Sequence, residues 1–179
     1  FTSSPICVPA RNSLLHGAWP CRHLSIANAD TEAPRPAVAL PAFPEILAGA
    51  GYDLTFIGKW LGGSARTPRD YGFHHVVPEK DYQAWRAGQN LPPRPGGLPF
   101  YGSDDAITPA QSRLAWGADQ VIAALRQSAA EPARPFLVRW DPSEPHLPNV
   151  VPKPFADMYD PKLIPPWPSF VDDFHGKPY

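Results

Sequence analysis

The pattern of hydrophobic and polar positions predicts helices and strands that alternate along the chain. A proline in the first turn and a glycine after the last turn are typical of a helix. Short apolar runs rich in β-branched and aromatic residues are typical of strands. These signals predict helices at about 9–16, 42–50 and 109–128, and strands at 54–57 and 136–140. Their alternation favours an α/β sandwich with a mostly parallel sheet.

The helix at 109–128 has the clearest start signal in the sequence. Thr108 is placed to cap it, Pro109 suits the first helical position, and Gln111 completes a capping box. Its apolar residues recur with helical spacing, which predicts that they form one buried face. They are Leu114, Ala118, Val121, Ile122 and Leu125.

Three stretches lack such periodicity and are expected to be loops. Residues 28–38 are polar and contain prolines, and residues 62–108 are rich in glycine, proline and charged residues. A connection as long as the second is usually functional when it belongs to a compact domain. Residues 142–179 form the third stretch, which is proline-rich and irregular.

Proline content alone would suggest a disordered chain. There are 26 prolines among 179 residues, whereas average proline usage is about 5%. Disorder at such a content also requires a scarcity of apolar residues. Hydrophobic residues make up 43% of this chain, so its length and composition fit one globular domain of about 100–200 residues.

The overall charge excludes some classes of partner. A formal net charge of −1 and a pI near 6.6 argue against a general nucleic-acid-binding protein, which normally carries a basic excess. No apolar run approaches the roughly 20 residues of a membrane-spanning helix. The two cysteines, Cys7 and Cys21, are too few for a disulfide framework or a zinc site. A single bridge between them stays open, so the sequence leaves the redox compartment undecided.

Reactive side chains fall at the predicted ends of helices and strands. Cys7 lies just before the predicted start of the first helix, and Arg11 follows four residues later. Lys59 follows the first predicted strand and His146 follows the second. Ligands of open α/β sheets gather beyond the carboxyl ends of the strands, so a site is expected there. Taken alone, Cys7 is either a buried small hydrophobe or a thiolate activated by the helix N-terminus and Arg11.

Four segments resemble landmarks of the formylglycine-dependent sulfatases, in the order in which that family has them. Residues 7–17 contain Cys-x-Pro-x-Arg followed by Leu-x-x-Gly, which is similar to the first sulfatase signature. Residues 51–60 end in Gly-Lys-Trp, as the second signature does. Residues 71–75 are similar to a Gly-Phe landmark, and residues 144–148 resemble the Pro-His-x-Pro segment. The chain therefore resembles a type I sulfatase of the alkaline-phosphatase-like superfamily.

The resemblance implies a three-layer αβα sandwich with a mostly parallel sheet, incomplete in this chain. Family members are far longer, so residues 1–179 are expected to be an internal fragment of the N-terminal catalytic domain. The first strand and the C-terminal part of that domain would then be missing. As an isolated polypeptide, such a fragment is expected to be inactive and poorly folded.

The resemblance also implies hydrolysis of sulfate esters with release of inorganic sulfate. In the family, a formylglycine-generating enzyme oxidises the signature cysteine, here Cys7, to Cα-formylglycine. One hydroxyl of the hydrated aldehyde attacks sulfur, and the second lets the diol collapse and expel sulfate. Arg11 would hold the diol, and Lys59 would bind sulfuryl and leaving-group oxygens. His146 would protonate the leaving oxygen.

A divalent cation, usually Ca²⁺, belongs to the family's active site. Carboxylate oxygens are the ligands that Ca²⁺ prefers. The resemblance implies that Cys7, as formylglycine, is the one member of that ligand set inside this chain. The doublets Asp104–Asp105 and Asp172–Asp173 stand at the wrong place in the family order. We interpret them as solvated acids in turns and assign them no metal role.

Two departures from the family's pattern bear on the chemistry. Ala10 stands where Ser is usual, which the modifying enzyme should tolerate because it reads mainly Cys, Pro and Arg. Leu61 stands where many members have a His that contacts the formylglycine hydroxyl. His23, His74 and His75 stay open as replacements for that His.

Two alternatives to a sulfatase stay open as well. One is a phosphonate monoester hydrolase or phosphodiesterase of the same superfamily, and the other is a catalytically inactive paralogue. Lys59 favours sulfate, whereas Leu61 weakens that preference. The partners expected of a sulfatase are a small-molecule sulfate ester and the formylglycine-generating enzyme, with no nucleic acid.

Overall fold

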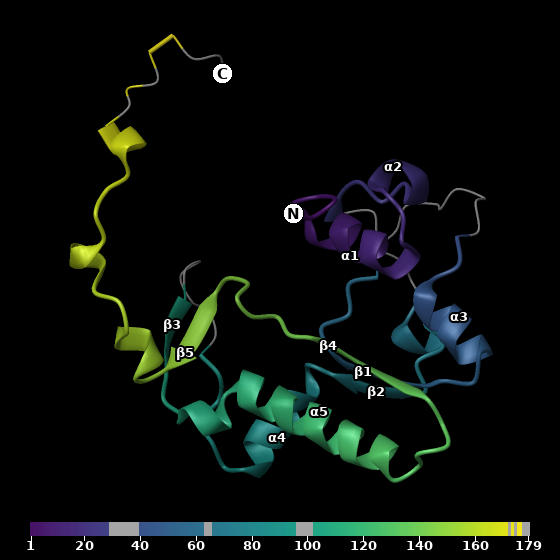
Figure 1. Ribbon diagram of the computed structural model, residues 1–179. Helices are drawn as coiled ribbons and strands as arrows, with labels where there is room; N and C mark the ends of the chain where they lie inside the picture. Colours follow the sequence, from purple (N-terminus) through teal and green to yellow (C-terminus); the bar gives the residue numbers. More distant parts are fainter. Residues whose placement is uncertain (29–39, 63–65, 96–101, 172, 174, 177–179) are drawn as a thin grey trace.

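The computed structural model describes residues 1–28, 40–62, 66–95, 102–171, 173 and 175–176 (Figure 1). Most of the predicted 28–38 loop lies outside the described residues. The helices are α1 (Cys7–His16), α2 (Pro20–His23), α3 (Phe43–Gly49), α4 (Asp81–Gly88) and α5 (Arg113–Ala129). The strands are β1 (Asp53–Gly58), β2 (His75–Pro78), β3 (Gly102–Asp105), β4 (Phe136–Asp141) and β5 (Asn149–Pro152).

The strands form two sheets in which every pairing is parallel. In the larger sheet, β1 lies between β2 and β4, and Gly58 of β1 pairs with Asp141 of β4. The carboxyl ends of these strands therefore share one edge. The smaller sheet pairs β3 with β5. Helix α5 packs on β1 and β4, and Figure 1 shows α1 and α3 on the opposite side of the larger sheet. The predicted α/β class with a mostly parallel sheet is confirmed.

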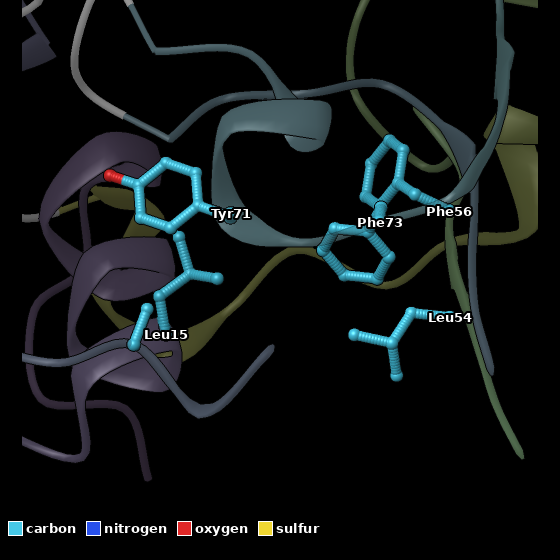
Figure 2. Packing of buried hydrophobic residues seen from close by; sticks show 6 residues of the cluster. Leu15, Leu54, Phe56, Tyr71 and Phe73 are labelled. Carbon is cyan, nitrogen blue, oxygen red and sulfur yellow. The ribbon is translucent and has the colours of Figure 1, made fainter. Parts of the chain in front are cut away.

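The hydrophobic core lies between the larger sheet and the helices α1 and α3. Alternate residues of β1, Leu54 and Phe56, point into it and are fully buried (Figure 2). Leu15 of α1 packs there together with Tyr71 and Phe73, which precede β2. The Phe56 and Phe73 rings meet edge to face at 5.5 Å between centroids, a favoured arrangement for aromatic pairs. Through Leu15, this core holds the last turn of α1 beside the sheet.

The predicted start of the third helix is wrong in detail. The Thr108 N–H and hydroxyl both donate to the Gln111 side-chain oxygen, but these bonds cap a single 3₁₀ turn at Pro109–Gln111. The α-helix begins only at Arg113, where the Ser112 hydroxyl accepts a hydrogen bond from the Ala115 N–H at 3.2 Å. Two capping signals follow one another here, and the second one starts α5.

The predicted buried face of that helix is also wrong. Trp116 and Gly117 are the buried residues of α5, whereas Leu114, Ile122 and Leu125 are each more than 40% exposed. The helix approaches β4 through Gly117, where an added Cβ would lie 3.0 Å from the Trp140 ring. Glycine permits this close approach. The face of α5 that contacts β4 is therefore the one with Gly117, and not the one with the predicted apolar residues. Trp140 on β4 is itself 36% exposed.

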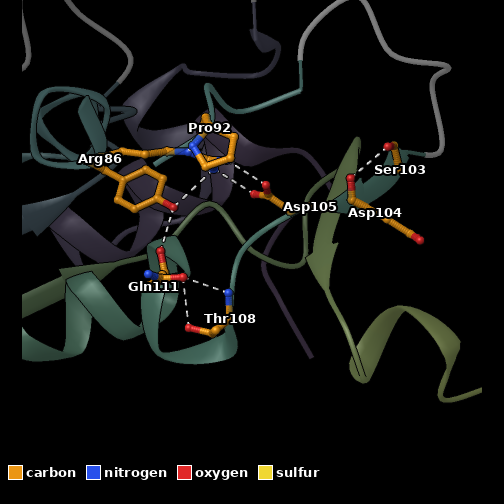
Figure 3. Close-up of polar contacts among 8 residues, drawn as sticks. Arg86, Pro92, Ser103, Asp104, Asp105, Thr108 and Gln111 are labelled. Atoms are coloured by element: carbon orange, nitrogen blue, oxygen red, sulfur yellow. Dashed lines mark hydrogen bonds and ion pairs between the residues drawn. The ribbon is translucent and has the colours of Figure 1, made fainter. Parts of the chain in front are cut away.

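Two predicted loops contain regular structure. The 62–108 stretch holds β2, α4 and β3, and the 142–179 stretch holds β5. A buried ion pair between Arg86 of α4 and Asp105 of β3 fastens the first stretch (Figure 3). The Tyr82 hydroxyl also donates to the Gln111 carbonyl at 2.9 Å. These contacts join residues far apart in sequence, so local periodicity did not indicate them.

Candidate active site

Helix α1 presents Cys7 and Arg11 on one face, because residues four apart in a helix lie above one another. The helix begins at Cys7 itself, about two residues earlier than predicted. Pro9 fits the first turn, where no N–H is required. Both Cys7 and Cys21 are free thiols, so the disulfide that the sequence left open does not form.

Asp141, the last residue of β4, joins two arginines beside Cys7. The Arg11 Nη1 donates to Asp141 Oδ2 at 2.6 Å. Arg139 forms a bidentate pair with the same carboxylate. Its Nη2 donates to Oδ2 at 2.7 Å and its Nε donates to Oδ1 at 2.9 Å. The arginine and aspartate side chains on β4 are 9% and 12% exposed. One carboxylate between two guanidinium groups leaves a local excess of positive charge.

Cys7 and this ion cluster line a common cavity of about 520 Å³. Its lining residues are Phe1, Thr2, Ser3, Cys7, Ala10, Arg11, Ser13, Leu14, Arg139 and Asp141. The cavity lies at the end of β4, where an open α/β sheet binds ligands. Its cationic groups make it suited to an anion.

Gly58 and Lys59 connect the end of β1 to the same place. The Lys59 N–H donates to the Asp141 carbonyl at 2.8 Å. Gly58 has a φ of +112°, and a Cβ added there would lie 2.2 Å from the Asp141 carbonyl oxygen. Only glycine therefore allows this strand end to approach β4. The Lys59 side chain is partly buried and is not among the described residues that line the Cys7 cavity.

His146 lies in the exposed loop that follows β4. Its Nδ1 donates to the Leu147 carbonyl at 2.6 Å, which assigns the proton on that nitrogen. His146 is not among the described residues that line the Cys7 cavity. The structure thus brings Cys7 and Arg11 together and leaves the side chains of Lys59 and His146 outside their cavity.

A second polar cluster positions the loop that carries His146. Arg113, at the start of α5, pairs with Glu79 at 2.8 Å and with Glu144 at 2.7 Å. The Ser143 hydroxyl donates to the Glu79 carboxylate at 2.5 Å. The loop after β4 is thereby held to the end of β2 and to the helix. Glu144 and Arg113 also line a mainly apolar cavity of about 410 Å³.

Arg94 lines this second cavity as well. Its burial, together with the positive charge of Arg113 nearby, holds the pKa of Arg94 below its ordinary value. The second cavity differs from the Cys7 cavity in its lining, because apolar side chains make up most of its wall.

The structure distinguishes His23 from His74 and His75, the three candidates to replace the family's usual His, by their positions relative to Cys7. His74 and His75 both lie 3.2 Å from the Asp53 carboxylate at the amino ends of the strands, which is the edge opposite Cys7. They are therefore excluded as partners of Cys7. His23 contacts the Ser13 hydroxyl at 2.9 Å, and Ser13 lines the Cys7 cavity.

The sequence interpretation missed Arg139 and Asp141. Arg139 lies within the strand predicted at 136–140 and Asp141 follows it directly, and the sequence pattern gives neither a functional role. An arginine in an otherwise apolar strand is a signal that could have found the pair, because a buried charge requires a partner.

The described residues do not form a calcium site. Among them, no three His, Cys, Asp or Glu side chains converge in a way that could hold a metal ion. Asp105 lies on β3 and not in a turn, and it is buried against Arg86, which corrects its interpretation as a solvated acid. Asp104 is exposed, and Asp172 lies outside the described residues. The implied calcium ligand at Cys7 stays a prediction.

Comparisons with known proteins complete the description of the site. No helix in the described ranges combines the length and the apolar character needed to cross a membrane. A search of curated proteins finds no match to the chain. The sulfatase family model matches residues 1–162, a range that includes Cys7, Lys59 and His146. Since this match covers most of the 179 residues, the chain belongs to the sulfatase family.

Proposed function

We propose that this chain carries the nucleophile side of a sulfatase active site, in which Cys7 is converted to formylglycine. The sulfatase family hydrolyses sulfate esters in general. The observation that carries the finer proposal is the common cavity of Cys7, Arg11, Arg139 and Asp141. A sulfate ester is an anion, and the positive charge of this cavity is complementary to it.

The residue made from Cys7 would supply a nucleophilic oxygen and a route for releasing sulfate. Charged side chains around position 7 would orient this group. Asp141 holds the Arg11 guanidinium at 2.6 Å, so Arg11 can orient the group at position 7 without rearranging. A preset cation also stabilises the negative charge that develops on sulfuryl oxygens.

Lys59 and His146 are proposed to act on the leaving-group side of the substrate. The backbone bond from Lys59 to Asp141 places this lysine at the same sheet edge as the arginine pair. In His146, the Leu147 carbonyl accepts from Nδ1, so Nε2 is the nitrogen that would deliver a proton to the leaving oxygen. Their position outside the Cys7 cavity fits groups that contact the other end of an ester.

The metal requirement stays part of the proposal. Sulfatases typically use a divalent cation, and carboxylate ligands favour Ca²⁺. The described residues do not supply such a set, so no catalytic step is assigned to the cation here. We also propose that further strands complete the domain. The partly exposed apolar side chains of Phe136 and Trp140 on β4 support this idea.

The proposal is tested by assaying the complete protein on an aryl sulfate and an aryl phosphonate ester side by side. We expect the aryl sulfate to be the better substrate and Cys7→Ala to abolish its hydrolysis, because the nucleophile is lost. Cys21→Ala is the matched control, since this exposed thiol does not line the cavity among the described residues, and it should retain activity.

The alternatives give different outcomes in the same assay. A clear preference for the phosphonate would favour the phosphonate monoester hydrolase or phosphodiesterase. Absence of turnover on both esters, with Cys7 left as a thiol, would favour the inactive paralogue.

A further inference from the structure

The mainly apolar cavity at the start of α5 takes no part in the proposed hydrolysis. Its volume is about 410 Å³, and cavities of about 300–1,000 Å³ are typical of small-molecule sites. Leu114 of α5, Val150 and Val151 of β5, and Phe155 after β5 form part of its apolar wall. A molecule that fills this cavity must therefore present a largely apolar surface.

Most charged side chains around this cavity are already paired. Both oxygens of Asp105 accept hydrogen bonds from Arg86. Arg113 pairs with Glu144 Oε1 at 2.7 Å, and the second oxygen of Glu144 is fully buried, so it does not face the open space. These groups stabilise the wall of the cavity and are not free to bind a ligand.

Arg94 and Ser112 line the cavity with hydrogen-bond donors that remain free. No hydrogen bond or ion pair links Arg94 to the described part of the chain. Enclosed atoms without a partner occur at other described residues and not at Arg94, so its nitrogens are accessible. The Ser112 hydroxyl accepts from the Ala115 N–H, and no described residue accepts its own hydrogen. Because both free groups are donors, the ligand must carry an acceptor, and the charge of Arg94 favours an anionic one.

A proline and an anchored carbonyl restrict the position of Arg94. Pro95 follows it and limits its backbone conformation. The Pro92 carbonyl accepts a hydrogen bond from buried Arg86, which ties the segment to α4 (Figure 3). Burial and the positive charge of Arg113 hold the pKa of Arg94 below its ordinary value, yet an arginine stays charged near neutral pH. An anion in the cavity would stabilise this partly desolvated charge.

We propose that this cavity binds a small molecule with an apolar body and one anionic oxygen group. Arg94 and Ser112 bind the anionic group, and Leu114 and Val151 contact the apolar body. The inference goes beyond the proposed function, because the described residues that line this cavity differ from those that line the Cys7 cavity.

The test measures the affinity of naphthoate for the complete protein by calorimetry, with naphthamide as a neutral molecule of the same shape. Naphthoate should bind more tightly. Arg94→Gln should lower naphthoate affinity about 10-fold or more, the value of one charge-assisted hydrogen bond, and leave naphthamide affinity unchanged. Arg126→Gln is the matched control. Arg126 is exposed on α5 and is not among the described residues that line the cavity, so its replacement should change neither affinity.

A measurement on the protein without a replacement guards against a structural effect of the variant. In NMR spectra, bound naphthoate should show contacts to the methyl groups of Leu114 and Val151. Arg94→Gln should also melt no lower than the original protein, because Arg94 has no hydrogen bond to a described residue that could be lost. Unchanged naphthoate affinity in Arg94→Gln, or the absence of contacts to these methyl groups, would overturn the inference.

Kinetics distinguishes two sources of such an anion. Asp141 lines the Cys7 cavity and Glu144 lines this one, and three residues of chain span at most about 11 Å, so a large substrate could reach both. If the apolar anion is the leaving part of a sulfate ester, naphthoate should raise the KM for an aryl sulfate, and Arg94→Gln should remove this rise. If it is a separate ligand, naphthoate should bind without changing the KM. Both results support the site and differ only in the source of the anion.

The binding test is separate from the test of hydrolysis. If naphthoate binds through Arg94 but the complete protein hydrolyses no sulfate ester, the proposed function fails and the apolar anion site stands. If hydrolysis occurs and Arg94→Gln leaves naphthoate affinity unchanged, the proposed function stands and the apolar anion site fails.

Discussion

At the scale of single residues, two aspartates of this chain show how a carboxylate organises buried arginines. Asp141 accepts from Arg11 and Arg139 and lies beside an open cavity. Asp105 accepts from Arg86 through two bonds, of 2.8 and 2.7 Å, and both partners are almost fully enclosed. The first cluster keeps a donor unpaired, whereas the second is closed. We infer that the second serves stability, because both of its charges are enclosed and paired.

The closed pair leads to a prediction about stability. Arg86→Met leaves the Asp105 carboxylate buried without its partner, which should lower the free energy of unfolding by about 3–5 kcal/mol. The double variant Arg86→Met/Asp105→Leu should regain most of that loss, because no charge is then buried. Chemical denaturation of the three proteins measures both effects.

The exposed pair of Lys153 and Asp157, at 3.1 Å, provides the comparison. Lys153→Ala should leave the denaturation curve almost unchanged, since exposed ion pairs contribute little. An Arg86→Met protein as stable as the Lys153→Ala protein would show that the buried pair does not hold α4 to β3.

At the scale of secondary-structure elements, the contact between β1 and β4 positions the site. Gly58 brings the end of β1 against the Asp141 carbonyl, and Lys59 follows it. A side chain at position 58 would clash with the backbone of β4 and would also be strained at a φ of +112°.

Gly58→Ala should therefore destabilise the protein by about 1–3 kcal/mol, the range for a residue forced into an unfavourable backbone conformation. It should also weaken sulfate binding, because Asp141 would move with its two arginines. Gly49→Ala is the matched control, since nothing lies within 4 Å of an added Cβ at the end of α3. Chemical denaturation measures the stability of the two variants, and calorimetry measures their affinity for sulfate. Equal stability of both variants would contradict the prediction.

The sequence predicted the elements whose signals are local. α1 and β1 were placed within two residues, because Pro9, Gly17 and a short apolar run define them. β2, β3 and β5 were missed, since each has only four residues and β3 reads Gly-Ser-Asp-Asp. Their formation depends on pairing with distant strands and on tertiary contacts.

The site was predictable to a similar extent. Cys7 and Arg11 belong to one motif on one helix, and their proximity followed from their spacing. Their contact with Asp141 joins residues 130 positions apart, so no local pattern indicated it. The same reason explains why His74 and His75 could not be excluded from sequence. Their position opposite Cys7 follows only from the register of β1 and β2.

At the scale of the whole molecule, the two edges of the larger sheet carry different groups. The carboxyl edge holds the arginine pair, Lys59 and the loop with His146, and the amino edge holds Asp53 with its histidines. After β5, the chain runs away from the sheets (Figure 1), and its large apolar side chains are exposed. Exposed apolar side chains in such number are typical of a surface that contacts other protein.

These features converge on one requirement, the chemical state of position 7. An unmodified thiol at position 7 would not supply the proposed nucleophilic oxygen, so the proposed hydrolysis needs the aldehyde. Cys7 is a free thiol in a Cys-x-Pro-x-Arg motif, which is the starting state that the proposed modification needs.

The most direct test is mass spectrometry of the Cys7 peptide from the complete protein, co-expressed with a formylglycine-generating enzyme. We expect the Cys7 side chain to lose its sulfur and become an aldehyde that reacts with a hydrazide probe. The Cys21 peptide in the same digest should keep its thiol. A Cys7 peptide that retains its thiol under these conditions would contradict the account.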